Sequence, residues 1–245
     1  LSSQRVVIFT GAGVSTESGI PDFRSPAGIW SKYDPEEFTY QSFVRSPEMR
    51  KRQWRMFEES GLLTEAKPNP AHYAIAELER LGKLDCVITQ NVDDLHQKAG
   101  VPREKVFELH GNMRWAKCLS CGKRYPVDEI RKRLKEEGEV PDCDECHGIL
   151  KPEGVLFGEL LPTDVLNEAT RRSRMCDLFI VIGSTLLVTP AAYMPSYALG
   201  SGAKLVIINL SSTPLDNSAD VLIRGKAGET MAKVMELVKS KISLS

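Results

Sequence analysis

The chain has 245 residues, long enough for one large α/β domain with a smaller appendage, and its 42% hydrophobic content can fill a packed core. Its 32 basic residues nearly balance its 33 acidic residues, so the overall charge does not indicate nucleic acid or an acidic lipid surface as a partner. Because no charged segment with an apolar run opens the sequence and no apolar stretch is long enough to span a bilayer, we expect a cytoplasmic protein without membrane contact.

The first predicted element is an apolar strand at residues 6–10 that ends in Gly11-Ala12-Gly13. Two glycines at such a turn let the backbone approach a pyrophosphate, whose oxygens accept hydrogen bonds from amides at a helix amino terminus. A dehydrogenase fingerprint needs a third glycine and an acidic residue after the second strand, but position 16 is Thr16 and Asp34 follows no apolar strand. Taken alone, the glycine pair is equally consistent with a tight turn that needs glycine.

Residues 25–67 interrupt the alternation of strands and helices and are rich in aromatic and charged side chains. A basic run begins at Arg50, and a second begins at Arg131. Because glutamates flank both runs, we interpret them as solvated helix faces and expect no direct nucleic-acid binding. A helix then follows from Asn69, which can cap its first turn, to Gly82, which ends it.

Two further apolar runs predict strands that end at Gln90 and His110. The carboxyl ends of parallel strands meet at one edge of a sheet, where ligands bind. His110 stands directly before a glycine, and a near-neutral imidazole there suits a general base; the alternative is a hydrogen-bonded core histidine. His72 and His147 are interpreted as structural or surface groups, and the role of His96 is undecided.

Residues 115–150 carry four of the six cysteines as two Cys-x-x-Cys pairs, which predict a tetrahedral, structural zinc site rather than disulfides. The four expected ligands are Cys118, Cys121, Cys143 and Cys146. The second pair, followed by His147, also matches the haem-attachment pattern, but that chemistry requires export and leaves the first pair unexplained. The other two cysteines, Cys86 and Cys176, lie in or beside apolar strands and are assigned to the core.

Three more apolar runs complete a predicted sheet of six strands. Most of the runs are continuous rather than alternating, which is typical of parallel strands covered by helices on both faces. The predicted strands are 6–10, 86–90, 105–110, 178–182, 205–209 and 221–224, and the helices after 69–82 are 163–174, 190–199 and 229–238. Polar residues again follow the strands, at Gly183-Ser184-Thr185 and at Asn209. The expected fold class is α/β, a doubly wound, Rossmann-like parallel sheet whose rim holds a nucleotide site with chemistry beside it.

The same pattern divides the chain into a main domain and a smaller domain formed from two insertions. We expect the main domain to comprise residues 1–24, 68–114 and 151–245. The smaller domain comprises residues 25–67, with a helical module, and residues 115–150, with the zinc module.

Several long motifs, in the same order and over nearly the whole chain, resemble those of the sirtuins, which are NAD-dependent protein lysine deacylases. They are GAGVSTESGIPDFRS, TQNVDDLHQKAG, FELHGN, the two Cys-x-x-Cys pairs, KPEGVLFGE, GSTLLVTPA and IINLSSTP. The resemblance accounts for the missing third glycine, because the phosphate loop of that family runs into a segment that folds over the nicotinamide half of NAD. It implies NAD as cofactor, a structural zinc ion, and an acetylated-lysine protein or peptide as substrate.

The resemblance also implies roles for individual residues. Phe23 would shield the reactive face of NAD from water, Gln90 would meet the nicotinamide ribose, and His110 would be the catalytic base. Asn91, also counted as catalytic, and Asp93 would form the pocket for the nicotinamide amide. The other expected cofactor contacts are Gly11, Ala12, Gly13, Asp22, Arg24, Gly183, Ser184, Thr185 and Asn209, and the expected substrate contacts are Val155, Phe157 and Gly158.

In the mechanism that the resemblance implies, loss of nicotinamide creates positive charge on a ribose carbon, which the acyl oxygen of the substrate lysine captures. His110 then takes a proton from a ribose hydroxyl, and the products are free lysine and acylated ADP-ribose. The alternatives are transfer of ADP-ribose to another acceptor, hydrolysis of NAD, or a zinc-containing module that only binds NAD. Two motifs depart from the family pattern: Gly183-Ser184-Thr185 replaces Gly-Thr-Ser, and Gly154 replaces an apolar residue.

The acyl preference is predicted from one helix. Sirtuins that prefer succinyl or malonyl lysine carry a Tyr-x-x-Arg pair, and the matching positions here are Trp54 and Phe57. Because neither residue supplies a cation, an acidic acyl group would lose water without gaining a partner, and we expect a preference for acetyl. A shift of one helical turn would instead bring Arg52 or Arg55 into the channel.

Overall fold

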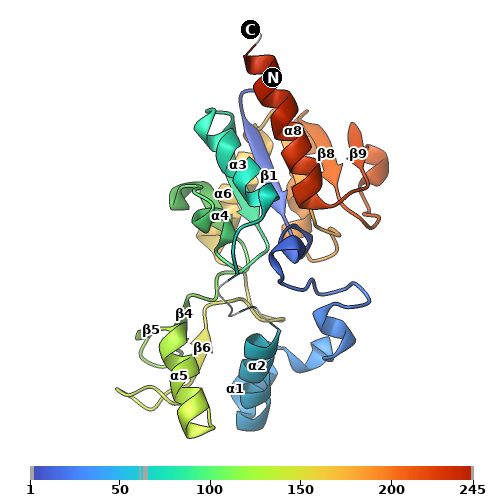
Figure 1. Cartoon of the computed structure of the whole chain (residues 1–245). Coiled ribbons are helices and arrows are strands. Elements are labelled where there is room, and N and C mark those ends of the chain that lie inside the picture. The colour runs from blue at the N-terminus through green and yellow to red at the C-terminus, as the bar shows by residue number, and fades with distance from the viewer. Residues whose placement is uncertain (1–2, 61, 63–65, 244–245) are drawn as a thin grey trace.

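The computed structural model describes residues 3–60, 62 and 66–243, and its largest element is a parallel sheet of six strands (Figure 1). The strands, in spatial order, are β3 (Val106–Glu108), β2 (Leu84–Thr89), β1 (Val6–Thr10), β7 (Leu178–Ile182), β8 (Lys204–Ile208) and β9 (Val221–Ile223). All six predicted strands are therefore confirmed, as is the doubly wound order. Several strands end one or two residues earlier than predicted, because their polar last residues already turn away into the loops.

Helices cover both faces of this sheet. Val6 and Ile8 of β1 pack with α3 (Pro70–Arg80) and α8 (Ala227–Ile242), whereas Val7 and Phe9 pack with α6 (Thr163–Met175) and α7 (Met194–Gly200). This alternation follows from the opposite directions of successive side chains in a strand. Short helices fill several connections: α4 (Leu95–Lys98) and the 3-10 helices Ala12–Val14, Thr16–Ser18, Ile29–Ser31, Pro35–Glu37, Arg103–Lys105, Ala191–Tyr193 and Asp216–Ser218.

Two helix predictions need correction in their bounds. The predicted helix 190–199 is divided into a 3-10 turn and α7, and Pro195 lies in the first turn of α7, where a residue without an amide hydrogen is tolerated. The last helix is longer than predicted at both ends. Among the residues that the structure describes, no helix combines the length and apolarity needed to cross a membrane.

The two insertions form one smaller unit, below the large sheet in Figure 1. The first insertion supplies α1 (Tyr40–Arg45) and α2 (Pro47–Glu59); the second supplies α5 (Val127–Glu137) and the antiparallel strands β4 (Trp115–Cys118), β5 (Arg124–Pro126) and β6 (Leu150–Pro152). Phe43 and Trp54 of the first insertion share a buried core with Ile130 and Leu150 of the second. Trp54 is fully buried, and its indole donates a hydrogen bond to the Leu150 carbonyl, so it serves packing.

The boundary after the second insertion lies slightly later than predicted. Lys151 and Pro152, which sequence analysis placed in the main domain, pair with Lys117 and Ala116 in the small antiparallel sheet. The sequence does not reveal this pairing, because a lysine and a proline have a low preference for strands.

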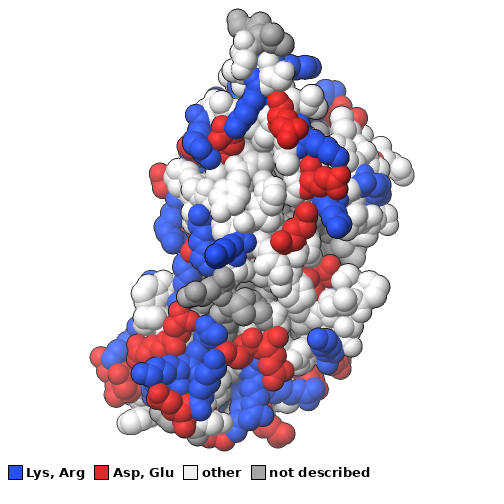
Figure 2. Space-filling view, viewed as in Figure 1, with Lys and Arg blue, Asp and Glu red and all other residues white. Residues whose placement is uncertain are grey.

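The two basic runs lie on neighbouring helices, α2 and α5, of the small unit. Arg131 and Lys135 both pair with Glu58, at 2.8 Å, and Lys51 pairs with Glu139. Figure 2 shows basic and acidic side chains interspersed over this part of the surface. The basic runs are thus partly neutralised by ion pairs between the two insertions, in addition to facing solvent.

Candidate active site

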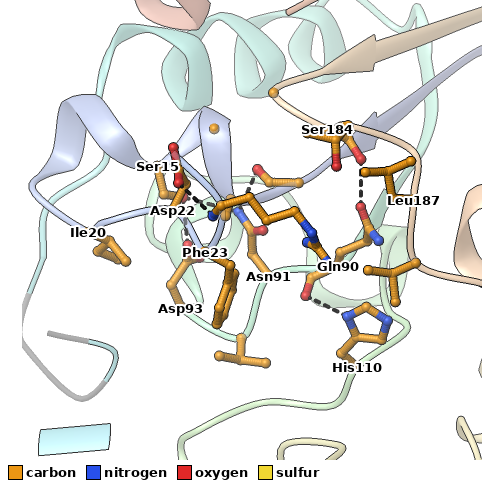
Figure 3. A pocket seen from close by; sticks show the side chains of 18 of the residues that line it. Ser15, Ile20, Asp22, Phe23, Gln90, Asn91, Asp93, His110, Ser184 and Leu187 are labelled. Carbon is orange, nitrogen blue, oxygen red and sulfur yellow. Dashed lines mark hydrogen bonds between the residues drawn. The ribbon is translucent and has the colours of Figure 1, made fainter. Parts of the chain in front are cut away.

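One cavity of about 1260 Å³ lies at the carboxyl ends of the large sheet. It reaches from Asn209, after β8, past the loops that follow β1 and β7, to the small unit. The strand order reverses between β1 and β7, and such a switch point is the usual ligand site of an open parallel sheet. Every residue predicted for cofactor binding, substrate binding or catalysis lines this cavity, while the four cysteines lie elsewhere. Figure 3 shows part of the lining, with Phe23, Asn91 and His110 among the labelled residues.

The glycine pair is explained by the close approach of two loops. The Gly13 amide donates to the Gly183 carbonyl at 2.9 Å. A Cβ atom at either Gly11 or Gly13 would lie only 2.8 Å from the Gly183 oxygen. Gly11 itself has an extended backbone with φ −122°, so close packing rather than a left-handed turn excludes larger side chains there. A 3-10 helix begins directly after Gly11, so a glycine-rich backbone borders the cavity.

Asn91 and Asp93 are held by Ser15, a residue that sequence analysis did not single out. The Asn91 side-chain amide donates to Ser15 Oγ at 3.1 Å and to the Gly11 carbonyl at 3.2 Å. Ser15 Oγ in turn donates to Asp93 Oδ2 at 2.6 Å, as Figure 3 shows. Burial raises the pKa of Asp93, while the hydrogen bonds from Ser15 and from the Leu95 amide act in the opposite direction. The only sequence signal for Ser15 is its place directly after the glycine loop.

His110 is fixed in one tautomer by its surroundings. Its Nδ1 lies 3.0 Å from the Gln90 carbonyl oxygen, which can only accept a hydrogen bond, so Nδ1 carries the proton. Nε2 is then the ring nitrogen that can accept a hydrogen bond, and the side chain lines the cavity. Burial lowers the pKa of His110, and the Gln90 carbonyl only partly opposes this. A neutral imidazole with an available nitrogen is the form that a general base requires.

The predicted cofactor residues Ser184 and Asn209 are also held by hydrogen bonds. Ser184 Oγ donates to Gln90 Oε1 at 2.7 Å and accepts from the Leu186 amide at 3.3 Å. The Asn209 side-chain amide donates to the Ser211 carbonyl at 2.9 Å. The Ser184 hydroxyl therefore already has partners within the protein. In the Gly183-Ser184-Thr185 motif, which differs from the Gly-Thr-Ser of the family pattern, the Thr185 hydroxyl is the one less constrained by such hydrogen bonds.

The segment after the glycine loop folds on itself beside the cavity. The Asp22 carboxylate accepts hydrogen bonds from the Arg24 amide at 3.0 Å and the Ser25 amide at 2.7 Å. The ring of Phe23 lies 5.3 Å from the ring of Trp30, centroid to centroid. These contacts place the Phe23 ring at the cavity, near Asn91 and Asp93 (Figure 3).

The predicted substrate wall joins the cavity to the small unit. The Val155 amide donates to the His110 carbonyl at 2.8 Å, and the Phe157 carbonyl accepts from the Tyr40 amide at 2.9 Å. Phe57 and its neighbour Met56, which belong to the core of the small unit, also line the cavity.

The side chains of α2 bear on whether Trp54 and Phe57, or instead Arg52 or Arg55, reach the cavity. Trp54 is packed in the core instead of lining the cavity. Arg52 pairs with Glu37 at 3.0 Å, and neither it nor Arg55 is among the cavity-lining residues described.

The four paired cysteines meet at one point of the small unit. Their sulfur atoms all lie within 4.8 Å of one another; Cys118 Sγ is 3.5 Å from Cys146 Sγ, and Cys121 Sγ is 3.6 Å from Cys143 Sγ. A tetrahedral zinc ion with Zn–S bonds of about 2.3 Å needs sulfurs about 3.8 Å apart, so this donor set fits zinc. Because both pairs contribute, the haem interpretation of the second pair alone does not fit.

The remaining histidines and cysteines have structural positions. His72 is buried and its Nδ1 accepts from the Asn69 amide at 3.3 Å, which completes a capping box at the start of α3. His96, undecided from the sequence, is buried with Nε2 2.9 Å from Thr10 Oγ1. Cys86 and Cys176 belong to the buried core, as predicted, and burial raises the pKa of Cys176 to about 12.

A doubly wound sheet with polar strand ends around a large cavity is the arrangement of a dinucleotide-binding protein. The sequence matches the model of the Sir2 family over residues 11–190. NAD-dependent protein deacetylase 1 of Pyrobaculum aerophilum is 47% identical, over 96% of this chain and 91% of the relative. NAD-dependent protein deacylase 2 of Archaeoglobus fulgidus is 48% identical, over 97% of this chain and 92% of the relative. The chain belongs to the Sir2 family.

Solved structures of the family have the same fold. One, from work on the mechanism and regulation of Sir2 enzymes, has a TM-score of 0.88 and 48% identity, and the match covers 97% of this chain and 94% of that one. A Sir2 protein with a deacetylated p53 peptide and 3'-O-acetyl ADP-ribose has a TM-score of 0.90 and 45% identity, with 96% and 94% covered. A Sir2 complex with a p53 peptide and NAD⁺ has a TM-score of 0.88 and 41% identity, with 97% and 95% covered.

Proposed function

We propose that this protein is an NAD-dependent protein deacetylase, which removes acetyl from lysine side chains and releases nicotinamide and O-acetyl-ADP-ribose. The observation that carries the proposal is the position of His110: a half-buried imidazole whose Nδ1 donates to the Gln90 carbonyl and whose pKa is lowered by burial, in the same cavity as the glycine loop and Asn91. The names of the relatives and the ligands of the related structures support the same activity.

The cavity fits NAD by the chemistry of its groups. The loop Gly11-Ala12-Gly13 offers backbone without bulky side chains for a pyrophosphate, and Asn209 and Thr185 offer polar groups on the adenosine side. Asn91 and Asp93 would hold the nicotinamide amide, with Phe23, Asp22 and Arg24 enclosing that half. Bound NAD supplies a carbon–nitrogen bond whose cleavage leaves a ribose carbon open to attack by the acyl oxygen.

The side chains of this protein then orient the reactants, exclude water and move a proton. Ser15 fixes the directions of Asn91 and Asp93, and the Phe23 ring restricts access of water. His110 accepts a proton at Nε2 from a ribose hydroxyl while the Gln90 carbonyl keeps Nδ1 protonated. Val155, Phe157 and Gly158 would line the channel for the substrate lysine. The zinc ion would stay outside the reaction, because the cysteines are not among the cavity-lining residues.

The proposed preference for neutral acyl groups is supported by the charges around the cavity. Among the described residues, the cations that line it are Arg24, in the segment after the glycine loop, and Lys226, near Asn209. Phe57 and Met56 also line the cavity, whereas Arg52 pairs with Glu37 and is not among the lining residues described. A carboxylate on the acyl group would therefore lose water in this part of the cavity without gaining a partner.

The decisive experiment incubates the protein with NAD and an acetyl-lysine peptide and follows peptide mass and nicotinamide together. Deacetylation predicts one acetyl group lost and one nicotinamide released per turnover. Release of nicotinamide without a change in peptide mass would instead identify an NAD hydrolase or a transferase to another acceptor. Binding of NAD with neither product would identify a binding module.

A further inference from the structure

A buried cation, Lys151, lies beside the cavity but outside the groups considered so far. It belongs to the edge strand β6, and its side chain is only 5% exposed. Lysine is rarely buried unless its charge is paired and hydrogen-bonded, because transfer of an ammonium group from water into protein is costly. The partners of this side chain therefore indicate what the buried charge is for.

All three hydrogens of the Lys151 ammonium group have acceptors. Nζ lies 2.9 Å from the Pro152 carbonyl, 2.8 Å from the Gly154 carbonyl and 3.0 Å from Glu159 Oε2. The same oxygen of Glu159 accepts a hydrogen bond from the Leu156 amide at 2.9 Å. Burial lowers the pKa of Lys151, and the negative charge of Glu159 opposes this. The pair thus spans the loop of residues 153–159 and binds its backbone at two points, the Gly154 carbonyl and the Leu156 amide.

The 153–159 loop contacts two other parts of the site. The Val155 amide donates to the carbonyl of His110, and Phe157 pairs with residues 38–40 of the first insertion, through the Tyr40 amide and a bridge to Thr39. A Cβ at Gly111 would lie 2.1 Å from the Glu153 carbonyl oxygen, so the loop already lies against the segment that carries His110. A change in this loop would alter the channel wall and the support of the His110 backbone together.

We propose that Lys151 and Glu159 are positioning residues whose buried ion pair holds the 153–159 loop in the shape that admits the substrate lysine. This inference rests on the proposed function, because it assigns the loop to the acyl-lysine channel. Loss of one partner would leave an unpaired buried charge or unpaired carbonyls, and the loop would relax. The NAD half of the cavity, at the ends of β1, β7 and β8, would keep its shape.

The first test replaces the ammonium group by an uncharged chain of similar length, in Lys151→Met. The control is Lys117→Met, because Lys117 lies opposite Lys151 on the neighbouring strand β4 but is exposed to solvent. We expect Lys151→Met to weaken binding of an acetyl-lysine peptide in the absence of NAD about 10-fold, measured by fluorescence anisotropy. The KM for the peptide should rise by about the same factor, a size typical for the loss of a residue that orients a site from outside it. The KM for NAD should change by less than about twofold. The control should match the wild type.

Two further variants separate positioning from general stability. Lys151→Arg restores the charge and should recover most of the peptide affinity. Glu159→Gln removes the charge of the other partner, and hydrogen exchange at residues 153–159 should become faster in it, as in Lys151→Met. The double variant Lys151→Met with Glu159→Gln should be no worse than the poorer single variant, because both changes break one pair.

The proposal is overturned if a folded Lys151→Met protein binds the peptide like the wild type. It is also overturned if peptide and NAD parameters worsen equally, because that result indicates a general structural role. If Lys151→Met does not fold, the peptide affinity and hydrogen exchange of Glu159→Gln decide in the same way. A wild type that binds the peptide but does not deacetylate it would refute the proposed function, whereas loop exchange and peptide binding would still test the ion pair.

Discussion

The rim of the large sheet and the cysteine cluster both gather polar or reactive side chains from distant parts of the chain, but they differ in what surrounds them. At the rim, Asn91, Asp93 and His110 line a cavity and retain atoms that are free to meet a ligand. In the cluster, the four sulfurs face one another at distances that leave room for one ion. An open set of groups can act on a substrate, whereas a closed set can only hold the fold together.

The largest effect is expected from a change in the cluster of four cysteines. Cys143→Ser should abolish zinc binding and unfold the small unit, because a structural zinc site can contribute on the order of 10 kcal/mol, comparable with the whole stability of a domain. Metal analysis should find one zinc per wild-type chain and none in the variant, and limited proteolysis should cut residues 115–150. The control, Cys176→Ala, should retain the metal. A metal-free Cys143→Ser protein with full activity would contradict a structural zinc.

Next in size is the expected effect of removing His110, the proposed base at the rim. His110→Ala should lower kcat for deacetylation about 10³-fold, within the range for general base catalysis, while NAD affinity stays within about threefold. Turnover and isothermal titration with NAD measure the two quantities. His147→Ala is the control, because this histidine is exposed beside the cysteine cluster. Near-normal turnover of His110→Ala would remove His110 from the mechanism.

The acyl preference tests the part of the cavity that Phe57 and Met56 line. We expect kcat/KM to be about 100-fold higher for an acetylated than for a succinylated peptide of the same sequence, since a desolvated, unpaired carboxylate costs a few kcal/mol. Phe57→Arg introduces a cation into this part of the cavity and should reduce the ratio of kcat/KM for the acetylated peptide to kcat/KM for the succinylated peptide. A wild-type preference for succinyl would show that a cation reaches the acyl group after all.

A smaller effect is expected at Asp93 and Ser15, in the proposed pocket for the nicotinamide amide. The Asp93 carboxylate accepts a short hydrogen bond from the Ser15 hydroxyl, and Asp93→Asn replaces this carboxylate by an uncharged amide. The variant should exchange labelled nicotinamide about 10-fold more slowly. Ser15→Ala should have a similar effect, because it releases both Asn91 and Asp93. An unchanged exchange rate in both variants would contradict the role of this network.

The smallest effect is a displacement of the pH profile. Burial lowers the pKa of His110, so the imidazole stays neutral until the pH falls below the ordinary histidine value of about 6.5. Activity should therefore be lost as the pH falls, with the acidic limb of kcat/KM centred below pH 6.5. His147→Ala should keep the same limb. A limb at or above pH 6.5 would mean that the imidazole is not desolvated in the working enzyme.

Much of the fold and the candidate site could be predicted, because local patterns carry the necessary information. Continuous apolar runs predicted six parallel strands, and residues at the strand ends, such as Gly11, Asn91 and His110, came together because parallel strands end at one edge. The spacing of the cysteines predicted their cluster. The helix 190–199 and the end of the second insertion were less well predicted, because Pro195 and the pairing of Lys151 depend on context.

The sequence by itself determined the strands, the glycine loop, the metal-ligand spacing and the family. Only the tertiary structure decided which tautomer His110 adopts, that Ser15 links Asn91 to Asp93, that the two insertions share one core, and that Lys151 is buried against Glu159. The physical reason is the range of the interactions. Burial patterns and turns depend on near neighbours in the chain. The His110 tautomer, the Ser15 network and the shared core instead join residues that are 20, 78 and 96 positions apart, and these residues meet only in the folded chain.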